Sequence, residues 1–404
     1  MPGTRSPAVN IPLITAVLAL LSVFPPVATD MYLSAMGDLS EALNASASAT
    51  EMSLSLFFLG LCVGQLIMGP LIDGYGRKGP LLVGAALFTL TSVGLLVVRD
   101  VTVFNTLRVL QAIGACAGMV VGRAVVNDLM EGRAAAKMMT VLVMLMTIGP
   151  IASPFLGSLL LTAFGWQSIF VAMVLVGAVA LVLAKVILPE TLPAEARTPA
   201  PFRAAFGRTG ELLRRPGFLS VALIAALVQG AMFAFITGSS GIFQGVFGLG
   251  SMEYGLVFAL VAVALVVFGQ LNSLLLNRYE PRRIVSVGLP VFVLAGVALL
   301  VVSGTSQLWV YVVPLWVAIG MVGLLSANAM SIAMESGRGA AGLASALVGA
   351  IQFGVAFLDS SAVAMAGSDR TLPMTLGILL PGALALLLWL RVMRREAAGA
   401  GARA

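Results

Sequence analysis

Long apolar runs separated by short charged stretches fill almost the whole chain. Six runs lie in the first half, each with at most one charged residue: 11–37, 52–72, 79–98, 101–122, 138–165 and 166–184. An α-helix needs about 20 apolar residues to cross the hydrocarbon core of a bilayer. Each run therefore predicts one membrane-spanning helix.

The second half continues this pattern with longer runs. The uncharged stretch 216–252 is too long for one span, so we expect helix seven to be followed by a glycine-rich external loop over 241–250. The stretch 284–334 must hold two spans with a turn at 303–307. Helices eight, eleven and twelve complete the set at 254–277, 339–367 and 371–390. The sequence thus predicts an all-α integral membrane protein of twelve spans.

A polar connector divides the spans into two sets of six. Five arginines lie between residues 197 and 215, and a short amphipathic helix is expected at 202–213. Segments that begin Gly-Gln-Leu at positions 64 and 269 both end in a basic pair, which favours two related halves. We therefore divide the chain into an N-terminal bundle at 1–187, a cytoplasmic linker at 188–216, a C-terminal bundle at 217–393 and a cytoplasmic tail at 394–404.

Basic residues predict the orientation. With both termini cytoplasmic, Arg99 and Arg370 lie outside and Arg108 lies within the membrane, which leaves 20 of the 23 Lys and Arg residues inside. This asymmetry follows the positive-inside rule. The net charge of +6 is therefore read as a topology signal, and no nucleic-acid partner is expected.

Composition agrees with a chain whose solvent is lipid. Apolar residues make up 60% and charged residues 10% of the chain, against roughly 25% charged residues in soluble domains. Histidine is absent, which removes Ser-His-Asp and Cys-His catalysis and the commonest zinc ligand. We therefore expect no enzyme, no metal and no cofactor, and we interpret Cys62 and Cys116 as small buried apolar residues.

The loop after the second span carries the most specific motif. From position 69 to 78 it reads Gly-Pro-Leu-Ile-Asp-Gly-Tyr-Gly-Arg-Lys, and it resembles the major facilitator superfamily signature G-x-x-x-D-R-x-G-R-R. The matching positions are Gly69, Asp73, Gly76, Arg77 and Lys78. The resemblance implies a conformational-switch loop whose charges contact the neighbouring half. Gly74 replaces the usual arginine, so either the contact is weaker or Arg77 carries the charge; a simple positive-inside loop is the alternative.

The fourth span extends this resemblance. Arg108 and Gln111 fit the superfamily motif R-x-x-Q-G-x-G, with Ala112 for the first glycine. A charged arginine within a span costs at least ~2.5–3.5 kcal/mol on insertion scales, so Arg108 should face a cavity or a partner unless it reaches the outer interface.

The fifth span resembles the G-P-x-x-x-P-x-x-G pattern typical of proton-coupled drug antiporters. Its matching residues are Gly149, Pro150, Pro154 and Gly157. Two prolines four residues apart must distort the helix, and kinked packing without a further role is the alternative interpretation.

The first span carries Ala-Thr-Asp-Met-Tyr-Leu-Ser-Ala-Met from position 28 to 36, which includes Asp30 and Tyr32. It is similar to the T-D-M-Y-L-P-A-M-P segment of bacterial Bcr/CflA-type drug exporters, and stretches 118–129 and 233–249 fit the same group. The resemblance implies a major-facilitator fold with twelve helices and both termini in the cytoplasm.

Candidate transport residues are the few polar groups inside the spans. A carboxyl in a low-dielectric site favours its protonated form and a nearby arginine favours the ionised form, so Asp30 is the best candidate for proton coupling, unless it is held in a permanent ion pair. Asp359 could be a second proton site, a cation contact or a tolerated acid on the cavity wall. Seven amides could line the cavity or join helices: Gln65, Gln111, Gln229, Gln270, Asn272, Asn328 and Gln352.

The resemblance and the pattern together give one functional interpretation. It is a monomeric proton-coupled antiporter of the bacterial inner membrane that exports small amphipathic, amphenicol- or bicyclomycin-like drugs by alternating access, with resistance as the consequence. Its partners are the drug, protons and the lipid bilayer. A proton-coupled uptake symporter for a small metabolite is the alternative.

Overall fold

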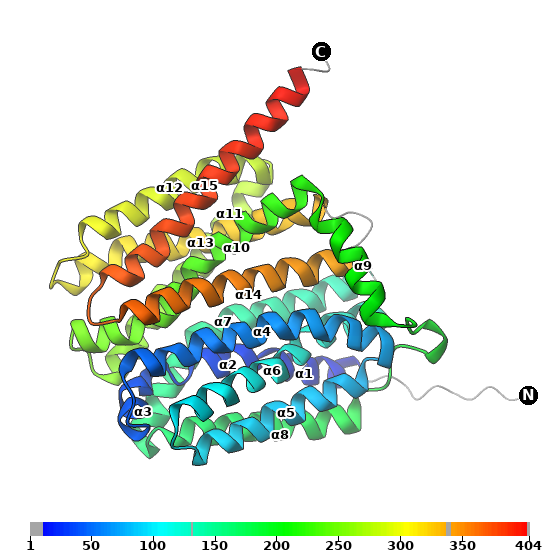
Figure 1. The fold of residues 1–404 in the computed structure, drawn as a ribbon, viewed down its shortest axis with the longest axis horizontal. Coiled ribbons are helices and arrows are strands. Elements are labelled where there is room, and N and C mark those ends of the chain that lie inside the picture. The colour runs from blue at the N-terminus through cyan, green and yellow to red at the C-terminus, as the bar shows by residue number, and fades with distance from the viewer. Residues whose placement is uncertain (1–10, 131, 337–340, 402–404) are drawn as a thin grey trace, which may run out of the picture.

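The computed structural model describes residues 11–130, 132–336 and 341–401, and helices dominate this part of the chain (Figure 1). The first half contains α1 (Ile11–Ser22), α2 (Phe24–Asp30), η1 (Leu33–Ala35), α3 (Met36–Ala42), α4 (Ala47–Tyr75), α5 (Lys78–Val97), α6 (Val101–Leu129), α7 (Gly132–Phe164) and α8 (Gln167–Ile187). The linker holds η2 (Ala194–Ala196) and α9 (Pro201–Leu213). The second half contains α10 (Pro216–Ser240), η3 (Gly241–Val246), α11 (Ser251–Leu276), α12 (Pro281–Val301), α13 (Leu308–Ser336), α14 (Ala341–Ala366) and α15 (Leu372–Gly401).

Helices long and apolar enough to cross a membrane account for most of the described residues. Eleven such spans are present there, the first running from Pro12 to Ala42, and α7 contributes a further apolar segment, Ile148–Phe164. The twelve spans expected from the sequence are therefore confirmed.

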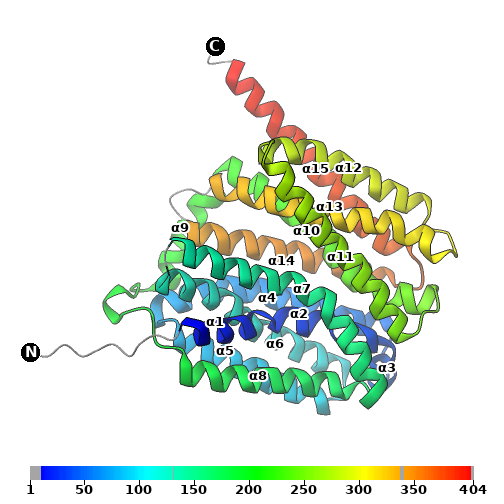
Figure 2. The ribbon, with the colours of Figure 1, turned by 180° about the vertical axis from the view of Figure 1, so that it is seen from behind.

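The spans form two halves that lie side by side. Helices α1–α8 occupy one half and α10–α15 the other, and α9 runs along the edge that joins them in both views (Figures 1 and 2). Helices α4 and α14 pack together across the boundary, as do α7 and α11. The short amphipathic helix expected in the linker is thus present as α9.

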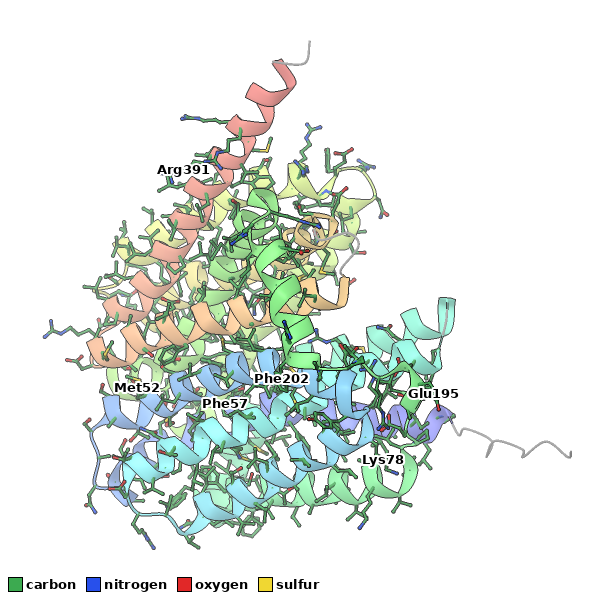
Figure 3. All side chains as sticks on the ribbon, turned by 45° about the vertical axis from the view of Figure 1, so that its right-hand side comes forward. Met52, Phe57, Lys78, Glu195, Phe202 and Arg391 are labelled. Atoms are coloured by element: carbon green, nitrogen blue, oxygen red, sulfur yellow. The ribbon has the colours of Figure 1, made fainter. Side chains whose placement is uncertain are left out.

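The two ends of the bundle differ. We call the end that carries α9 the linker end and the opposite end the far end. Lys78 and Glu195 lie at the linker end, Met52 lies at the far end, and Phe202 lies on α9 (Figure 3).

The first span is not the single helix expected over 11–37. It is broken into α1, α2, η1 and α3, with a turn at Val23 and a second break at Met31 and Tyr32. Proline has no backbone N–H and fits the first turn of a helix, so Pro25 and Pro26 start α2 rather than continue α1. Asp30 is the last residue of α2 and lies directly before the second break.

The prediction of a glycine-rich loop over 241–250 is also wrong for most of these residues. Residues 241–246 continue α10 as the π-helix η3, and the N–H of Phe247 donates to the carbonyl of Ile242 at 2.9 Å. The buried side chains of Ile242 and Phe243 hold this turn against the protein. The chain leaves helical structure from residue 247 to residue 250.

Candidate functional site

A cavity of about 800 Å³ lies between the two halves. Drug-sized ligands occupy mostly apolar cavities of this order with a few polar groups on the wall. The polar groups here come from both halves: Thr29, Asp30, Gln65, Arg123, Gln229, Gln270, Ser326, Ser345 and Gln352. The wall extends from Phe58 in the middle of α4 to Ser345 in the first turns of α14, so the cavity approaches the linker end.

Side chains close the boundary between the halves at the far end. Among the described residues, three hydrogen bonds cross it: Ser48 to the carbonyl of Ala364, Ser368 to the carboxyl of Glu51, and Ser158 to the carbonyl of Ser251. Small residues let the backbones approach there, because a Cβ on Gly255 would lie 2.8 Å from Oγ of Ser158. The structure is therefore closed at the far end.

Asp30 lies on the cavity wall but is 1% exposed. Its Oδ1 atom has no hydrogen-bond partner in the described part of the structure. An ionised carboxylate in such a place is costly unless it is paired, so the neutral form fits this buried position best.

Arg108 lies behind this wall and is completely buried. Its Nη2 donates to the carbonyl of Ala28 at 2.7 Å and its Nη1 donates to Oε1 of Gln111 at 2.6 Å. The rings of Tyr32 and Phe57 cover its guanidinium at 4.4 and 4.5 Å. Such cation–π contacts and charge-assisted hydrogen bonds stabilise a cation away from water. Arg108 thus anchors the broken first span.

The remaining members of this cluster complete its hydrogen bonds. The hydroxyls of Tyr32 and Ser53 lie 2.8 Å apart, and Nε2 of Gln111 donates to Oγ of Ser92 at 2.8 Å. Both Tyr32 and Gln111 are fully buried. The structure therefore brings Tyr32, Arg108 and Gln111 together behind the cavity wall, while Asp30 lies on the wall itself.

The fifth-span motif packs against the backbone beside Asp30. A Cβ on Gly149 would lie 2.5 Å from Cβ of Pro26, and one on Gly157 would lie 1.8 Å from the carbonyl oxygen of Met31. Both glycines therefore permit close approach of α7 to the broken first span. Pro150 lines the cavity, and Pro150 and Pro154 both lie inside α7.

Asp359 lies apart from Asp30, in α14 of the second half. A Cβ on Gly230 would lie 3.5 Å from its Oδ2 atom, and one on Gly377 would lie 3.4 Å from its Oδ1 atom. These glycines place the carboxyl between α10, α14 and α15. Asp359 is not among the residues that line the described cavity wall, and its Oδ2 has no hydrogen-bond partner in the described part of the chain.

The structure sorts the seven intramembrane amides. Four line the cavity, and the other three join helices, with Nδ2 of Asn328 donating to Oδ1 of Asn272 at 2.6 Å. Gln65 and Gln270 both line the cavity and are offset by 205 residues, the offset of the sequence repeat. Equivalent positions of the two halves therefore face the same space.

The switch-loop motif lies at the linker end and contacts the linker. Arg77 pairs with Asp73 at 2.7 Å and with Asp128 at the end of α6 at 3.0 Å. Gly76 has a φ of +92°, which glycine adopts without strain. Although partial burial acts to lower the pKa of Arg77, Asp128 and Asp73 outweigh it and raise the pKa above its usual value. The ion pairs of Arg77 thus stay within the first half, whereas the resemblance implied contacts to the neighbouring half.

The linker completes this network. Glu190 accepts hydrogen bonds from the backbone N–H of Arg77 at 2.7 Å and of Lys78 at 3.2 Å. Burial acts to raise the pKa of Glu190, but these N–H groups, that of Leu192 and the charge of Arg197 together lower it below its usual value. Gly69 lies in α4 with open space around it.

Gly74, which replaces the usual arginine of the motif, has a structural reason. A Cβ there would lie 2.4 Å from Cγ of Pro201, the first residue of α9. Position 74 thus receives the start of the linker helix, which leaves no room for an arginine in this arrangement.

Two charged residues of the site were not predicted from the sequence. Arg123 was expected among the cytoplasmic basic residues, but it lies in α6 and lines the cavity. Glu51 is the second; it is 3% exposed and contacts Ser368 across the halves. Arg123 could have been found because it lies one residue beyond the apolar run 101–122, whereas nothing in the sequence pairs Glu51 with Ser368.

Apolar spanning helices in two halves around a cavity that is closed at one end define a membrane transporter. The chain belongs to the Major Facilitator Superfamily, whose family model matches residues 18–358. It is therefore a multi-pass membrane transporter and not an enzyme.

The chain is similar to several named bacterial proteins. The chain is 28% identical over 370 residues to the uncharacterized MFS-type transporter YdgK of Bacillus subtilis, covering 90% of each chain. It is 28% identical over 358 residues to a bicyclomycin resistance protein homolog of Haemophilus influenzae, covering 88% of this chain and 90% of that one. It is 32% identical over 276 residues to the multidrug resistance protein MdtL of Shigella flexneri, covering 68% of this chain and 70% of that one.

Solved structures share the fold. A D-xylose-proton symporter matches with a TM-score of 0.75 at 16% identity, covering 94% of this chain and 97% of that one. The inward-open conformation of the xylose transporter XylE from E. coli matches with a TM-score of 0.69 at 16% identity, covering 93% of this chain and 95% of that one.

Proposed function

We propose that this protein is a proton-coupled antiporter that exports small amphipathic drugs from the bacterial cytoplasm. The observation that carries the proposal is Asp30, a carboxyl without a partner for its Oδ1 atom on the wall of a drug-sized cavity. The names of the relatives from Haemophilus influenzae and Shigella flexneri support drug export, and the fifth-span motif supports antiport. Amphenicol- and bicyclomycin-like compounds are the substrates that fit this group.

The coupling cycle follows from the exposure of Asp30. When the cavity opens to the outside, water reaches the carboxyl and a proton can bind. When the far end closes, the neutral carboxyl is buried at low cost, and its proton leaves toward the cytoplasm as drug enters from the linker end. Because a bound proton and a bound drug favour different states, one gradient can drive the other.

Energetics permit this exchange. One charge that moves through 100 mV is worth about 2.3 kcal/mol. At 1.4 kcal/mol for each factor of ten, this supports roughly a 40-fold gradient of a neutral drug for each proton.

Antiport and symport predict opposite fluxes in proteoliposomes. We expect a labelled amphenicol to move against the proton gradient, so that acid outside drives drug out of right-side-out vesicles. Drug uptake that rises with an inward proton gradient would show that the protein is a symporter. The fully uncoupled control is the same vesicle with a protonophore.

A further inference from the structure

Arg123 is a cation on the cavity wall that the coupling cycle does not use. It lies in α6, six residues before the last residue of that helix. At 1.5 Å for each residue, the 15 residues that separate it from Arg108 place it roughly 22 Å closer to the linker end. A substrate that enters from the linker end therefore meets Arg123 before it reaches the level of Asp30.

Arg108 and Arg77 differ from Arg123 in having partners around their guanidinium groups in the described part of the chain. Arg108 has carbonyl and amide oxygens and two aromatic rings around its guanidinium, and Arg77 has two carboxylates. Within the described ranges 11–130, 132–336 and 341–401, Arg123 has neither a hydrogen bond nor an ion pair. An uncompensated guanidinium on the wall of a mostly apolar cavity favours the entry of an anionic partner.

The shape of the guanidinium narrows the class of partner. Arginine presents parallel N–H donors that match a carboxylate or another planar oxyanion with two hydrogen bonds. The rest of the wall suits an apolar body, because Met119, Met144, Phe233 and Phe353 all line the cavity. Asp30 is too buried to offer its charge to a cationic ligand in this state.

We infer that Arg123 binds the anionic end of an amphipathic substrate, so that the cavity selects compounds with one carboxylate or an equivalent oxyanion over cationic compounds of the same size. The inference rests on the proposed function in that the cavity holds the substrate. It assigns to Arg123 the choice of substrate charge, separate from the proton step at Asp30.

Three fluorescent probes with the same aromatic body test this inference by equilibrium binding to the full chain in lipid nanodiscs. Dansylglycine carries a carboxylate, its methylamide is neutral, and dansylcholine carries a quaternary ammonium. A hydrogen-bonded charge pair is worth about 1.5–3 kcal/mol, which corresponds to roughly a 10- to 100-fold difference in Kd. We expect dansylglycine to bind at least about 10-fold more tightly than its methylamide, and dansylcholine to bind most weakly.

Substitutions separate a direct contact from a general effect of charge. Arg123→Gln should raise the Kd of dansylglycine about 10-fold and leave the Kd of the methylamide within about twofold of its original value. Arg123→Lys should retain part of the preference for dansylglycine over its methylamide. Lys185→Gln removes an exposed cation at the linker end of α8 and is the matched control. It should change the Kd of neither dansylglycine nor its methylamide. Equal loss for all probes, equal affinity of all probes, or no measurable binding of dansylglycine would overturn the inference.

The binding test is independent of the direction and coupling of transport. If the charge preference holds but proton-driven export fails, the inference stands and the proposed function does not. If proton-driven export of a neutral drug is observed without any charge preference, the proposed function stands and Arg123 has another role.

Discussion

Arg108 reaches the carbonyl of Ala28, two residues before Asp30, and yet forms no ion pair with the Asp30 carboxyl in the described structure. The rings of Tyr32 and Phe57 cover the guanidinium instead. The cation therefore orients the backbone that carries the acid without neutralising the acid. A permanent ion pair, the alternative that the sequence left open for Asp30, is absent from this state.

Asp30→Asn should abolish proton-driven efflux, because an amide cannot take up and release a proton at physiological pH. We expect drug accumulation driven by a pH gradient to fall to the background of empty liposomes, while exchange of labelled for unlabelled drug without a gradient continues. Transport in proteoliposomes measures both. Asp359→Asn is the matched control, since it removes the buried carboxyl of the other half, and it should retain proton-driven efflux. Full drug resistance in cells with Asp30→Asn would contradict the role of Asp30.

Arg108→Lys should reduce both stability and transport although it keeps the charge. A lysine is a point charge and cannot reproduce the two directed bonds to Ala28 and Gln111. Loss of hydrogen bonds to a charged group costs about 1.5–3 kcal/mol, so the Tm in detergent should fall clearly. Arg99→Lys at the exposed far end is the control and should leave the Tm unchanged. An unchanged Tm for Arg108→Lys would mean that the bonds to α2 contribute nothing.

Gly157→Ala should separate α7 from the first span. The new Cβ would meet the carbonyl oxygen of Met31, so the backbone must move. We expect a lower Tm and loss of proton-driven transport. Gly269→Ala adds the same methyl in α11, where nothing lies within 4 Å of the new Cβ. Helix propensity predicts that this change raises the stability of the protein by about 0.5–1 kcal/mol. Equal effects of the two changes would refute the packing argument.

A cross-link at the far end should hold the protein in the closed state. In a chain with Cys62 and Cys116 replaced by serine, Ser158→Cys and Ser251→Cys place thiols on α7 and α11, where Oγ of Ser158 now donates to the carbonyl of Ser251 at 2.7 Å. A short thiol-reactive linker should stop transport while leaving access from the linker end. Each single cysteine variant, treated in the same way, should remain active. Transport by the cross-linked double variant would exclude opening at the far end.

Glu190→Gln should release the linker from the switch loop. The lowered pKa of Glu190 means that its contribution is present above its usual pKa of 4.5 and is lost as the pH falls through the lower pKa of the folded state. A spin label at an introduced cysteine in place of the exposed Glu195 should become more mobile in acid in the wild type. With Glu190→Gln the label should be mobile already at neutral pH. Mobility that does not depend on pH in the wild type would exclude this anchor.

The spans were predictable from the sequence because their signal is local. Twenty apolar residues in a row determine a helix in lipid, and a charged residue inside a span is easy to see, as with Asp30 and Arg108. The breaks in the first span were missed although Pro25 and Pro26 mark one of them. The six residues from 241 to 246 were expected to be a loop because glycine suggests a turn, whereas burial of Ile242 and Phe243 decided in favour of a helix.

The site was harder to predict because it depends on contacts between distant residues. Asp30 and Arg108 were both identified, but their separation depends on where the chain breaks after Asp30. Glu51 contacts Ser368 across 317 positions, and no local pattern can indicate such a pair. The packing of Gly74 against Pro201 likewise required knowledge of where α9 begins.

The three hydrogen bonds described at the far end contribute to the free-energy difference between a closed and an open state. At about 1 kcal/mol each, they favour the closed state by roughly 3 kcal/mol, or a ratio of about 100 to 1 before packing is counted. A membrane voltage of 100 mV acting on one charge provides about 2.3 kcal/mol, which is close to the same amount. The cost of breaking these three hydrogen bonds is therefore of the same order as the energy that one charge gains from the resting voltage of a cell, and a much stronger seal would put the open state out of reach of that energy.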